Sequence, residues 1–377
     1  MASRTGGRDA GAGAQGNPAG RGATCNPDSR YSSERREAED DGWPADDPPP
    51  PLRTQVGVDT SRSLISYNQS PDIPFDRSVN PYRGCEHGCI YCYARPTHAW
   101  LGLSPGLDFE IRLFRKPDAA RQLEQELAAP RYRPATLVLG ANTDPYQPIE
   151  RRFGTTRAVL QVLHDCRHPV AITTKSALVL RDLDLLVPMA ELGLVAVQIS
   201  VTSLDAHLAR RLEPRAASPE RRLEVVRRLA QAGVPVGVLV SPLIPGLTDV
   251  DLERILERAA AAGASRAGCL LIRLPREVAE LFDAWLRVQV PDRAERILSL
   301  IRQCRGGRLN DPEFGSRMTG RGPVADLLAQ RFRLAARRLG LDQQDREWDL
   351  DASRFRRPRL PGSQLDLFEQ DSRSPQP

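Results

Sequence analysis

The sequence predicts an α/β fold whose core is a parallel sheet of about six βα units. One observation is a series of short apolar runs rich in β-branched residues, which lack the polar alternation of a half-exposed sheet. Another is that longer amphipathic stretches with helix signals separate these runs. We expect strands at residues 135–140, 170–174, 194–201, 234–240 and 267–272, with a further strand before residue 85. The pattern alone fits a barrel-like sheet or an open doubly wound sheet.

Two of the intervening helices carry explicit start and stop signals. Ser218, Pro219 and Glu220 provide an N-cap, a first-turn proline and an acidic first turn, and Gly233 ends the helix. Thr248 is expected to cap the next helix, which stops at Gly263.

The two ends of the chain differ in composition from its middle. Residues 1–60 are rich in Gly, Ala, Arg and Asp and include four consecutive prolines at 48–51. Such a segment buries too little apolar surface to offset chain entropy, so we expect disorder, with a docking island at 20–31. The folded core is expected at 61–305, a helical C-terminal extension at 306–350 and a disordered tail at 351–377.

The C-terminal extension contains one amphipathic helix, predicted at residues 322–339. We expect this helix to close the open side of a partial barrel rather than to contact nucleic acid. Its apolar face is expected to consist of Val324, Leu327, Leu328, Phe332, Ala335 and Leu339.

Composition excludes several classes of protein. The chain has 377 residues and no uninterrupted apolar stretch of membrane-spanning length, and its N-terminus lacks the apolar region of a secretory signal. We therefore expect a cytoplasmic protein that does not enter the membrane. The 53 basic residues only slightly exceed the 48 acidic ones, and Lys116 and Lys175 are the only lysines. Seven cysteines in a reducing compartment favour metal binding or catalysis over disulfides.

The strongest chemical signal is a cluster of three cysteines, Cys85, Cys89 and Cys92, flanked by glycines. Thiolates at this spacing suit zinc or an iron–sulfur cluster. Three thiolates on a four-iron cluster leave one iron open to another ligand. The alternative is a structural zinc site in which His87 or His98 supplies the fourth ligand.

The segment NPYRGCEHGCIYCYAR resembles the radical SAM superfamily, whose signature is C-x3-C-x2-C with an aromatic residue, here Tyr91, before the last cysteine. It is most similar to the spore-photoproduct-lyase-like branch, and the resemblance extends over residues 63–305. It implies a partial (β/α)6 barrel, a [4Fe-4S] cluster on the three cysteines and S-adenosylmethionine on the open iron. The implied product of the reduced cluster is a 5′-deoxyadenosyl radical, with flavodoxin or ferredoxin as the expected reductant.

In such barrels the chemistry lies at the carboxyl ends of the strands. Lys175 follows an apolar strand, and the resemblance implies that it pairs with the methionyl carboxylate of the cofactor; an exposed loop lysine is the alternative. The other expected cofactor-binding residues are Tyr91, Asn142, Asp144, Ser200 and Ser241. Turn formation would also explain Asn142 and Asp144. Glu213, Pro214 and Arg215 resemble a motif of the same branch, which binds cofactor or substrate or forms a structural ion pair.

The sequence departs from photoproduct lyase at one position. That enzyme uses a cysteine near the end of its second strand as hydrogen donor, whereas residues 137–144 contain none. Tyr146 is a candidate donor in its place. The remaining cysteines of the folded core, Cys166, Cys269 and Cys304, are expected to be buried packing residues.

A second motif lies in the polar C-terminal tail, where Q-L-x-L-F resembles the peptide that binds the bacterial β sliding clamp. In that reading Leu367 and Phe368 occupy a hydrophobic pocket and Gln364 fixes the register. The motif consists of Gln364, Leu365, Leu367 and Phe368. The alternative is an apolar segment that folds back onto the barrel.

Together these features indicate a radical S-adenosylmethionine enzyme that acts on nucleic acid, with DNA repair as the expected context. One alternative keeps the enzyme class but makes the substrate a tRNA, a peptide or a metabolite. Another is a zinc-stabilised, DNA-associated binding protein.

Overall fold

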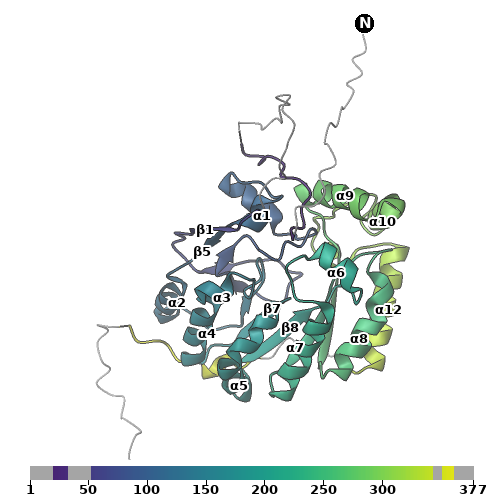
Figure 1. The fold of residues 1–377 in the computed structure, drawn as a ribbon. Coiled ribbons are helices and arrows are strands. Elements are labelled where there is room, and N and C mark those ends of the chain that lie inside the picture. Colours follow the sequence, from purple (N-terminus) through teal and green to yellow (C-terminus); the bar gives the residue numbers. More distant parts are fainter. Residues whose placement is uncertain (1–19, 33–51, 343–349, 361–377) are drawn as a thin grey trace, which may run out of the picture.

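The computed structural model describes residues 20–32, 52–342 and 350–360, and its centre is a seven-stranded sheet (Figure 1). Six of the strands are parallel and only β2 is antiparallel, pairing with β3 at one edge. The strand order is β10-β9-β8-β7-β6-β3-β2. Their bounds are β2 (Ile65–Tyr67), β3 (Arg77–Val79), β6 (Leu137–Leu139), β7 (Val170–Thr174), β8 (Val195–Ser200), β9 (Val236–Leu243) and β10 (Arg266–Leu271).

The strand order decides between the two sheet types that the sequence left open. A doubly wound sheet reverses its order at a switch point, whereas here each parallel strand lies beside the next one in the chain. One face, carrying Val195, Val197 and Ile199, packs in the main hydrophobic core. The fold is therefore the expected partial (β/α)6 barrel. Its outer helices are α2 (Ala119–Ala128), α4 (Thr155–Asp165), α5 (Leu183–Glu191), α7 (Pro219–Gln231), α8 (Leu252–Ala261) and α12 (Pro323–Arg338).

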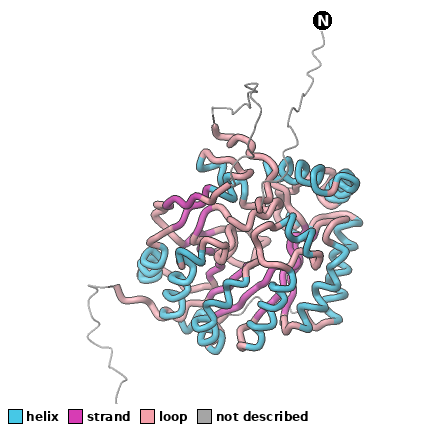
Figure 2. Tube along the Cα trace, viewed as in Figure 1, coloured by secondary structure: helices cyan, strands magenta, loops and turns pink. Residues whose placement is uncertain are grey.

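Smaller elements gather at one end of the strands, where Figure 2 shows most of the loop structure. A second, three-stranded sheet has the order β1-β5-β4. The cysteine segment lies in the chain between its strands β4 and β5. The remaining elements are β1 (Gln55–Val58), β4 (Tyr82–Arg83), β5 (Arg112–Arg115), α1 (Asp108–Ile111), α3 (Glu150–Phe153), α6 (Ala206–Leu212), α9 (Glu277–Gln289), α10 (Ala294–Gln303) and α11 (Ser316–Thr319).

All six expected strands are present, and the helix signals are confirmed with two corrections. Ser218 caps α7 by accepting the Arg221 N–H. Thr248 was expected to cap a helix with its side chain, but its hydroxyl oxygen accepts the Ile244 N–H, 2.9 Å away. Leu327 was expected on the buried face of α12, yet it is 56% exposed. The face turns because Ala325 and Ala336 bring the helix close to β10 and α8.

The expectation of disorder over residues 1–60 is wrong for residues 52–60, whereas the docking island expected at 20–31 is present. Residues 52–60 include β1, which pairs in parallel with β5. Residues 20–32 dock on the cysteine segment, where Arg21 donates to the Glu110 carbonyl and to Thr54. Gly22 fits because a Cβ there would lie 1.8 Å from the Gly88 oxygen. Composition averaged over sixty residues hides these few specific contacts.

The expected disordered tail at 351–377 also begins with an ordered segment. Residues 350–360 cross the amino-terminal edge of the barrel, where the Arg356 N–H donates to the Cys166 carbonyl. The Phe355 ring lies 5.4 Å from that of His168 and 5.8 Å from that of Tyr132. His168 is fully buried and hydrogen bonds to the Tyr132 hydroxyl (2.7 Å) and to the Pro169 carbonyl (2.9 Å). Burial lowers the pKa of His168 to about 4, with a smaller effect of Arg77.

Candidate active site

The three cysteines lie in one tight loop between β4 and the helical turn that begins at Arg95. Cys85 and Cys89 are buried, Cys92 is half-buried and all three thiols are free. Burial raises the pKa of each thiol, and Cys85 is raised further by Asp144 and by the other two cysteines. Three buried, unbonded thiols in such a loop fit an iron–sulfur cluster.

Arg95 holds this loop in shape from beneath. Its fully buried guanidinium donates to the carbonyls of Cys89 (2.9 Å) and Gly88 (3.2 Å) and pairs with Glu110 at 2.5 Å. Glu110 in turn accepts the backbone N–H groups of Gly22 and Ala23. The loop is therefore fixed through its backbone, which leaves the thiols available as ligands.

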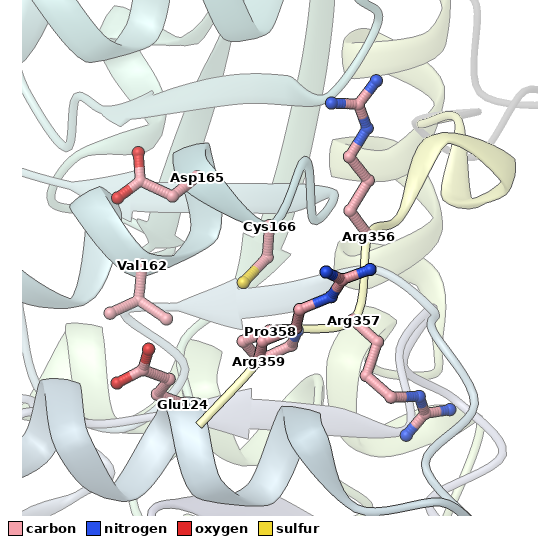
Figure 3. Close-up of a pocket in the computed structure, with 8 residues that line it drawn as sticks. All are labelled: Glu124, Val162, Asp165, Cys166, Arg356, Arg357, Pro358 and Arg359. Carbon is pink, nitrogen blue, oxygen red and sulfur yellow. The ribbon is translucent and has the colours of Figure 1, made fainter. Parts of the chain in front are cut away.

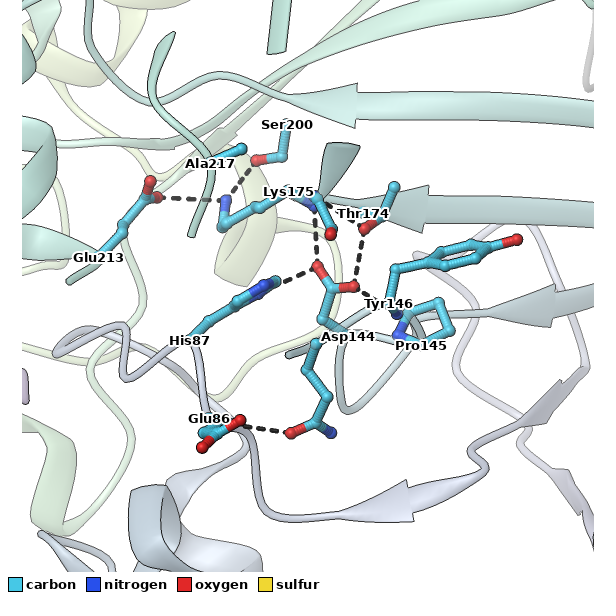
Figure 4. Close-up of polar contacts among 12 residues, drawn as sticks. Glu86, His87, Asp144, Pro145, Tyr146, Thr174, Lys175, Ser200, Glu213 and Ala217 are labelled. Atoms are coloured by element: carbon cyan, nitrogen blue, oxygen red, sulfur yellow. Dashed lines mark hydrogen bonds and ion pairs between the residues drawn. The ribbon is translucent and has the colours of Figure 1, made fainter. Parts of the chain in front are cut away.

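The βα loop after β6 contacts the cysteine loop from the side of the barrel. Gln147, which sequence reasoning did not single out, accepts the Glu86 N–H at 2.8 Å and donates to the Gly84 carbonyl at 3.1 Å. Asp144 lies 3.3 Å from Nδ1 of His87, an ion-pair distance without hydrogen-bond geometry (Figure 4). Burial alone would raise the pKa of Asp144, but His87 and the hydrogen bonds hold it below its usual range.

Lys175 lies where the sequence placed it, at the carboxyl end of β7. Its Nζ donates to the Ser200 hydroxyl at 2.5 Å and to the Ser241 carbonyl at 3.2 Å, and it lies 3.4 Å from Glu213 Oε1. The same Nζ lies 5.9 Å from the centre of the Tyr91 ring. Four of the expected cofactor-binding residues, Lys175, Ser200, Ser241 and Tyr91, thus meet at the barrel mouth. Figure 4 shows Lys175 beside Ser200 and Glu213.

Glu213 connects Lys175 to a second buried cation. Its carboxylate accepts hydrogen bonds from Arg222, Tyr91 and Thr202, the last at 2.7 Å. Burial alone would raise the pKa of Glu213, but Arg222 and then Lys175 hold it well below its usual range. Arg222 and Thr202 carried no signal of their own in the sequence, because both lie in ordinary helical or loop surroundings.

The other expected residues have mixed outcomes. Asn142 uses its backbone N–H to bind the Asn80 side chain at 3.0 Å, and Asp144 accepts from Thr174 and Tyr146 as a turn residue does. Tyr146 is not a hydrogen donor at the mouth: it is fully buried and its hydroxyl donates to Asp182 at 3.1 Å. Of the three packing cysteines, Cys166 and Cys304 are buried and Cys269 is half-buried.

The two histidines proposed as a fourth zinc ligand face other groups. Nε2 of His98 lies 2.9 Å from the Arg112 carbonyl, and burial lowers its pKa to about 4. His87 faces Asp144. Across the described ranges no group of three or more His, Cys, Asp or Glu side chains is arranged to hold a single metal ion.

A cavity of about 270 Å³ lies at the opposite edge of the barrel, far from this chemistry (Figure 3). It forms where the C-terminal segment crosses α2 and α4, and it is lined by Glu124, Val162, Asp165, Cys166, Arg356, Arg357, Pro358 and Arg359. The clamp motif at residues 364–368 lies outside the described residues.

Comparisons with known sequences agree with the geometry of the mouth. The family model of the radical SAM superfamily matches residues 79–259. An uncharacterised protein of Mycobacterium tuberculosis is 36% identical over 265 residues, which cover 70% of this chain and 76% of the relative. An uncharacterised protein of Methanocaldococcus jannaschii is 30% identical over 173 residues, 46% of this chain and 62% of the relative.

Among solved structures, spore photoproduct lyase complexed with dinucleoside spore photoproduct superposes with a TM-score of 0.55 at 16% identity, over 75% of this chain and 78% of that one. A mutant of the same lyase with bound AdoMet and dinucleoside spore photoproduct gives 0.54 at 16% identity, with the same coverage. These likenesses show the shared fold. No helix in the described part of the chain is both long and apolar enough to cross a membrane.

Proposed function

The chain belongs to the radical SAM superfamily, and on that premise we propose that this [4Fe-4S] and S-adenosylmethionine enzyme acts on nucleic acid, with DNA as the expected substrate. When bound, the cluster and its cofactor supply the radical that removes hydrogen from the substrate. The observation that supports the proposal is the barrel mouth, where the loop with the three free thiols also carries Tyr91, whose ring centre lies 5.9 Å from the Lys175 ammonium group, in a lyase-like fold.

The chain's own residues would bind and orient the two cofactors. Cys85, Cys89 and Cys92 would hold the cluster, in a loop that Arg95 fixes through its carbonyls. Lys175 would pair with the methionyl carboxylate, with Ser200 setting the direction of its ammonium group. Direct reversal of a thymine lesion is not proposed, because residues 137–144 contain no cysteine and Tyr146 is buried against Asp182.

Anaerobic reconstitution followed by a substrate comparison tests this proposal. The protein, reduced by flavodoxin or ferredoxin, is incubated with S-adenosylmethionine deuterated at the 5′ carbon and with DNA, tRNA or a peptide digest. We expect DNA to raise the yield of 5′-deoxyadenosine and to exchange label with it, and Cys89→Ala to abolish both. Exchange with tRNA or peptide alone would refute DNA as the substrate while leaving the enzyme class intact.

The C-terminal motif supports a DNA context from the sequence alone. We propose that Gln364, Leu365, Leu367 and Phe368 bind the β sliding clamp. Deletion of the last fourteen residues should abolish co-purification with the clamp, and Leu367→Ala with Phe368→Ala should do the same. If both variants still bind the clamp, the proposal that this motif binds it is refuted.

A further inference from the structure

Arg273 is a cation at the barrel mouth for which the described residues provide no counter-charge of its own. It follows β10, the last strand, at the carboxyl edge of the sheet. One terminal nitrogen lies 3.6 Å from Sδ of Met318, and its Nε is buried without a hydrogen-bond partner in the described part of the chain. The carboxylate that attracts Arg273 electrostatically is that of Asp72, which is already paired with Arg317 at 2.5 Å.

The surroundings of Arg273 are themselves positive. Burial lowers the pKa of Arg273, and the neighbouring Arg317 lowers it further. In Arg305, Nη2 donates to the carbonyls of Leu271 (3.0 Å) and Ile272 (2.7 Å), and Nη1 donates to those of Ser316 and Arg317. Burial lowers the pKa of Arg305 to about 10. Of these guanidinium groups Arg317 has Asp72 as its partner, whereas Arg273 has no carboxylate of its own among the described residues, so an anion beside Arg273 would be stabilised.

Aromatic side chains accompany these cations. Tyr93 directly follows the last cluster cysteine, is 47% exposed, and has its ring centre 5.8 Å from the Arg273 guanidinium. Its hydroxyl donates to the Ala141 carbonyl, which holds the ring in place across the mouth. Phe314, 58% exposed, lies against Arg317 at 4.6 Å. Guanidinium groups beside exposed aromatic faces are the usual means of holding an unpaired nucleotide.

We propose that Arg273 binds a phosphate group of the substrate and that the exposed face of Tyr93 stacks against an adjacent base. This inference deepens the proposed function, since it names the part of a nucleic acid that the mouth would recognise. Arg273 is distinct from the site expected for the methionyl carboxylate. Lys175 follows β7, and two strands lie between β7 and β10, so the two strand ends are roughly 14 Å apart.

Inorganic phosphate tests the site without reference to the substrate. We expect phosphate to raise the melting temperature of the wild-type protein relative to chloride at equal ionic strength, and Arg273→Met to remove that shift. Arg228→Met is the matched control, because Arg228 is an exposed arginine near the carboxyl end of α7, at the opposite edge of the barrel. A shift that persists in Arg273→Met, or one absent from the wild type, would overturn the proposal.

A twelve-nucleotide single-stranded DNA then identifies the source of the phosphate. We expect Arg273→Met to weaken its binding roughly tenfold, the loss of one charge-assisted hydrogen bond, and to reduce the salt slope by about 0.7. Tyr93→Ala should weaken binding without changing the salt slope, and S-adenosylmethionine affinity should be the same in both variants. Lost cofactor affinity in Arg273→Met would assign Arg273 to the cofactor instead. If the wild type binds phosphate but no DNA, the anion site stands and nucleic acid fails as the substrate.

Discussion

Replacement of Lys175 by methionine is the sharpest test of how the mouth binds S-adenosylmethionine. The substitution removes the ammonium group but keeps a chain of similar length. The fold should tolerate it, because Glu213 keeps the hydrogen bonds of Arg222, Tyr91 and Thr202. The buried carboxylate is therefore never left without a cation.

The size of the effect follows from the contacts that Lys175 already makes. A hydrogen bond to a charged group contributes about 1.5–3 kcal/mol, or roughly 10- to 140-fold in a dissociation constant. In the described structure the ammonium group lies 3.4 Å from Glu213, so the cofactor's carboxylate must compete with that contact. We therefore expect the lower part of this range, a weakening of roughly 10- to 30-fold.

Equilibrium dialysis of reconstituted protein measures this dissociation constant directly. The matched control is Lys116→Met, since Lys116 is the other lysine of the chain. It directly follows β5 and lies near Asp59. Because there are only two lysines, reductive methylation read by mass spectrometry adds an independent measurement. Cofactor should protect Lys175 and not Lys116 from methylation. An unchanged dissociation constant together with equal methylation would refute the assignment.

Three further predictions concern the scaffold, two near the cysteine loop and one at the amino-terminal edge of the barrel. Arg95→Met should lower the free energy of unfolding by about 3–5 kcal/mol, because it leaves buried Glu110 unpaired, whereas exposed Arg121→Met should cost under about 0.5 kcal/mol; urea titration measures both. Gly22→Ala should lower the iron content by displacing residues 20–32 from the cysteine loop. Gly20→Ala has open space at its Cβ but a φ of +75°, so it should cost only backbone strain and should retain iron. His168 binds its proton more weakly in the folded protein than in the unfolded chain. The free energy of unfolding should therefore fall by about 3 kcal/mol as the pH falls from roughly 6.5 to 4. His168→Asn should flatten that pH dependence, and an unchanged pH dependence would exclude His168 as its cause.

The sequence predicts the parts of this fold and site that depend on local pattern. Five apolar runs correspond to β6 through β10, since a strand covered on both faces must be continuously apolar. The cysteine loop is also local: three thiols lie within eight residues, with Gly84 before them and Gly88 between the first two, so they stay together wherever the rest of the chain goes. Lys175 could be placed because parallel strands share one carboxyl edge.

The missed features are those created by contacts between distant segments. Glu213 was expected to bind cofactor or substrate or to form an ion pair, but its partner Arg222 was not expected, because α7 must pack beside β8 to bring the two together at Lys175. A docking island at 20–31 was expected, but not the place where it docks, which depends on the backbone approach of Gly22 to Gly88, 66 positions later. Tyr146 lies near the right strand end in sequence, but its side chain turns into the core towards Asp182.

The two cations of the mouth differ in what an incoming anion must displace. Lys175 already has Glu213 within ion-pair distance. A carboxylate of the cofactor would replace that contact by a similar one, so the main effect of Lys175 is to orient the cofactor. Arg273 has a neighbouring cation and a carboxylate already paired elsewhere, so an anion there relieves repulsion as well as gaining a hydrogen bond. The Lys175 ammonium group thus has a counter-charge before the cofactor binds, whereas the Arg273 guanidinium group gains one only from its ligand. Salt should therefore weaken oligonucleotide binding far more steeply than binding of the zwitterionic cofactor.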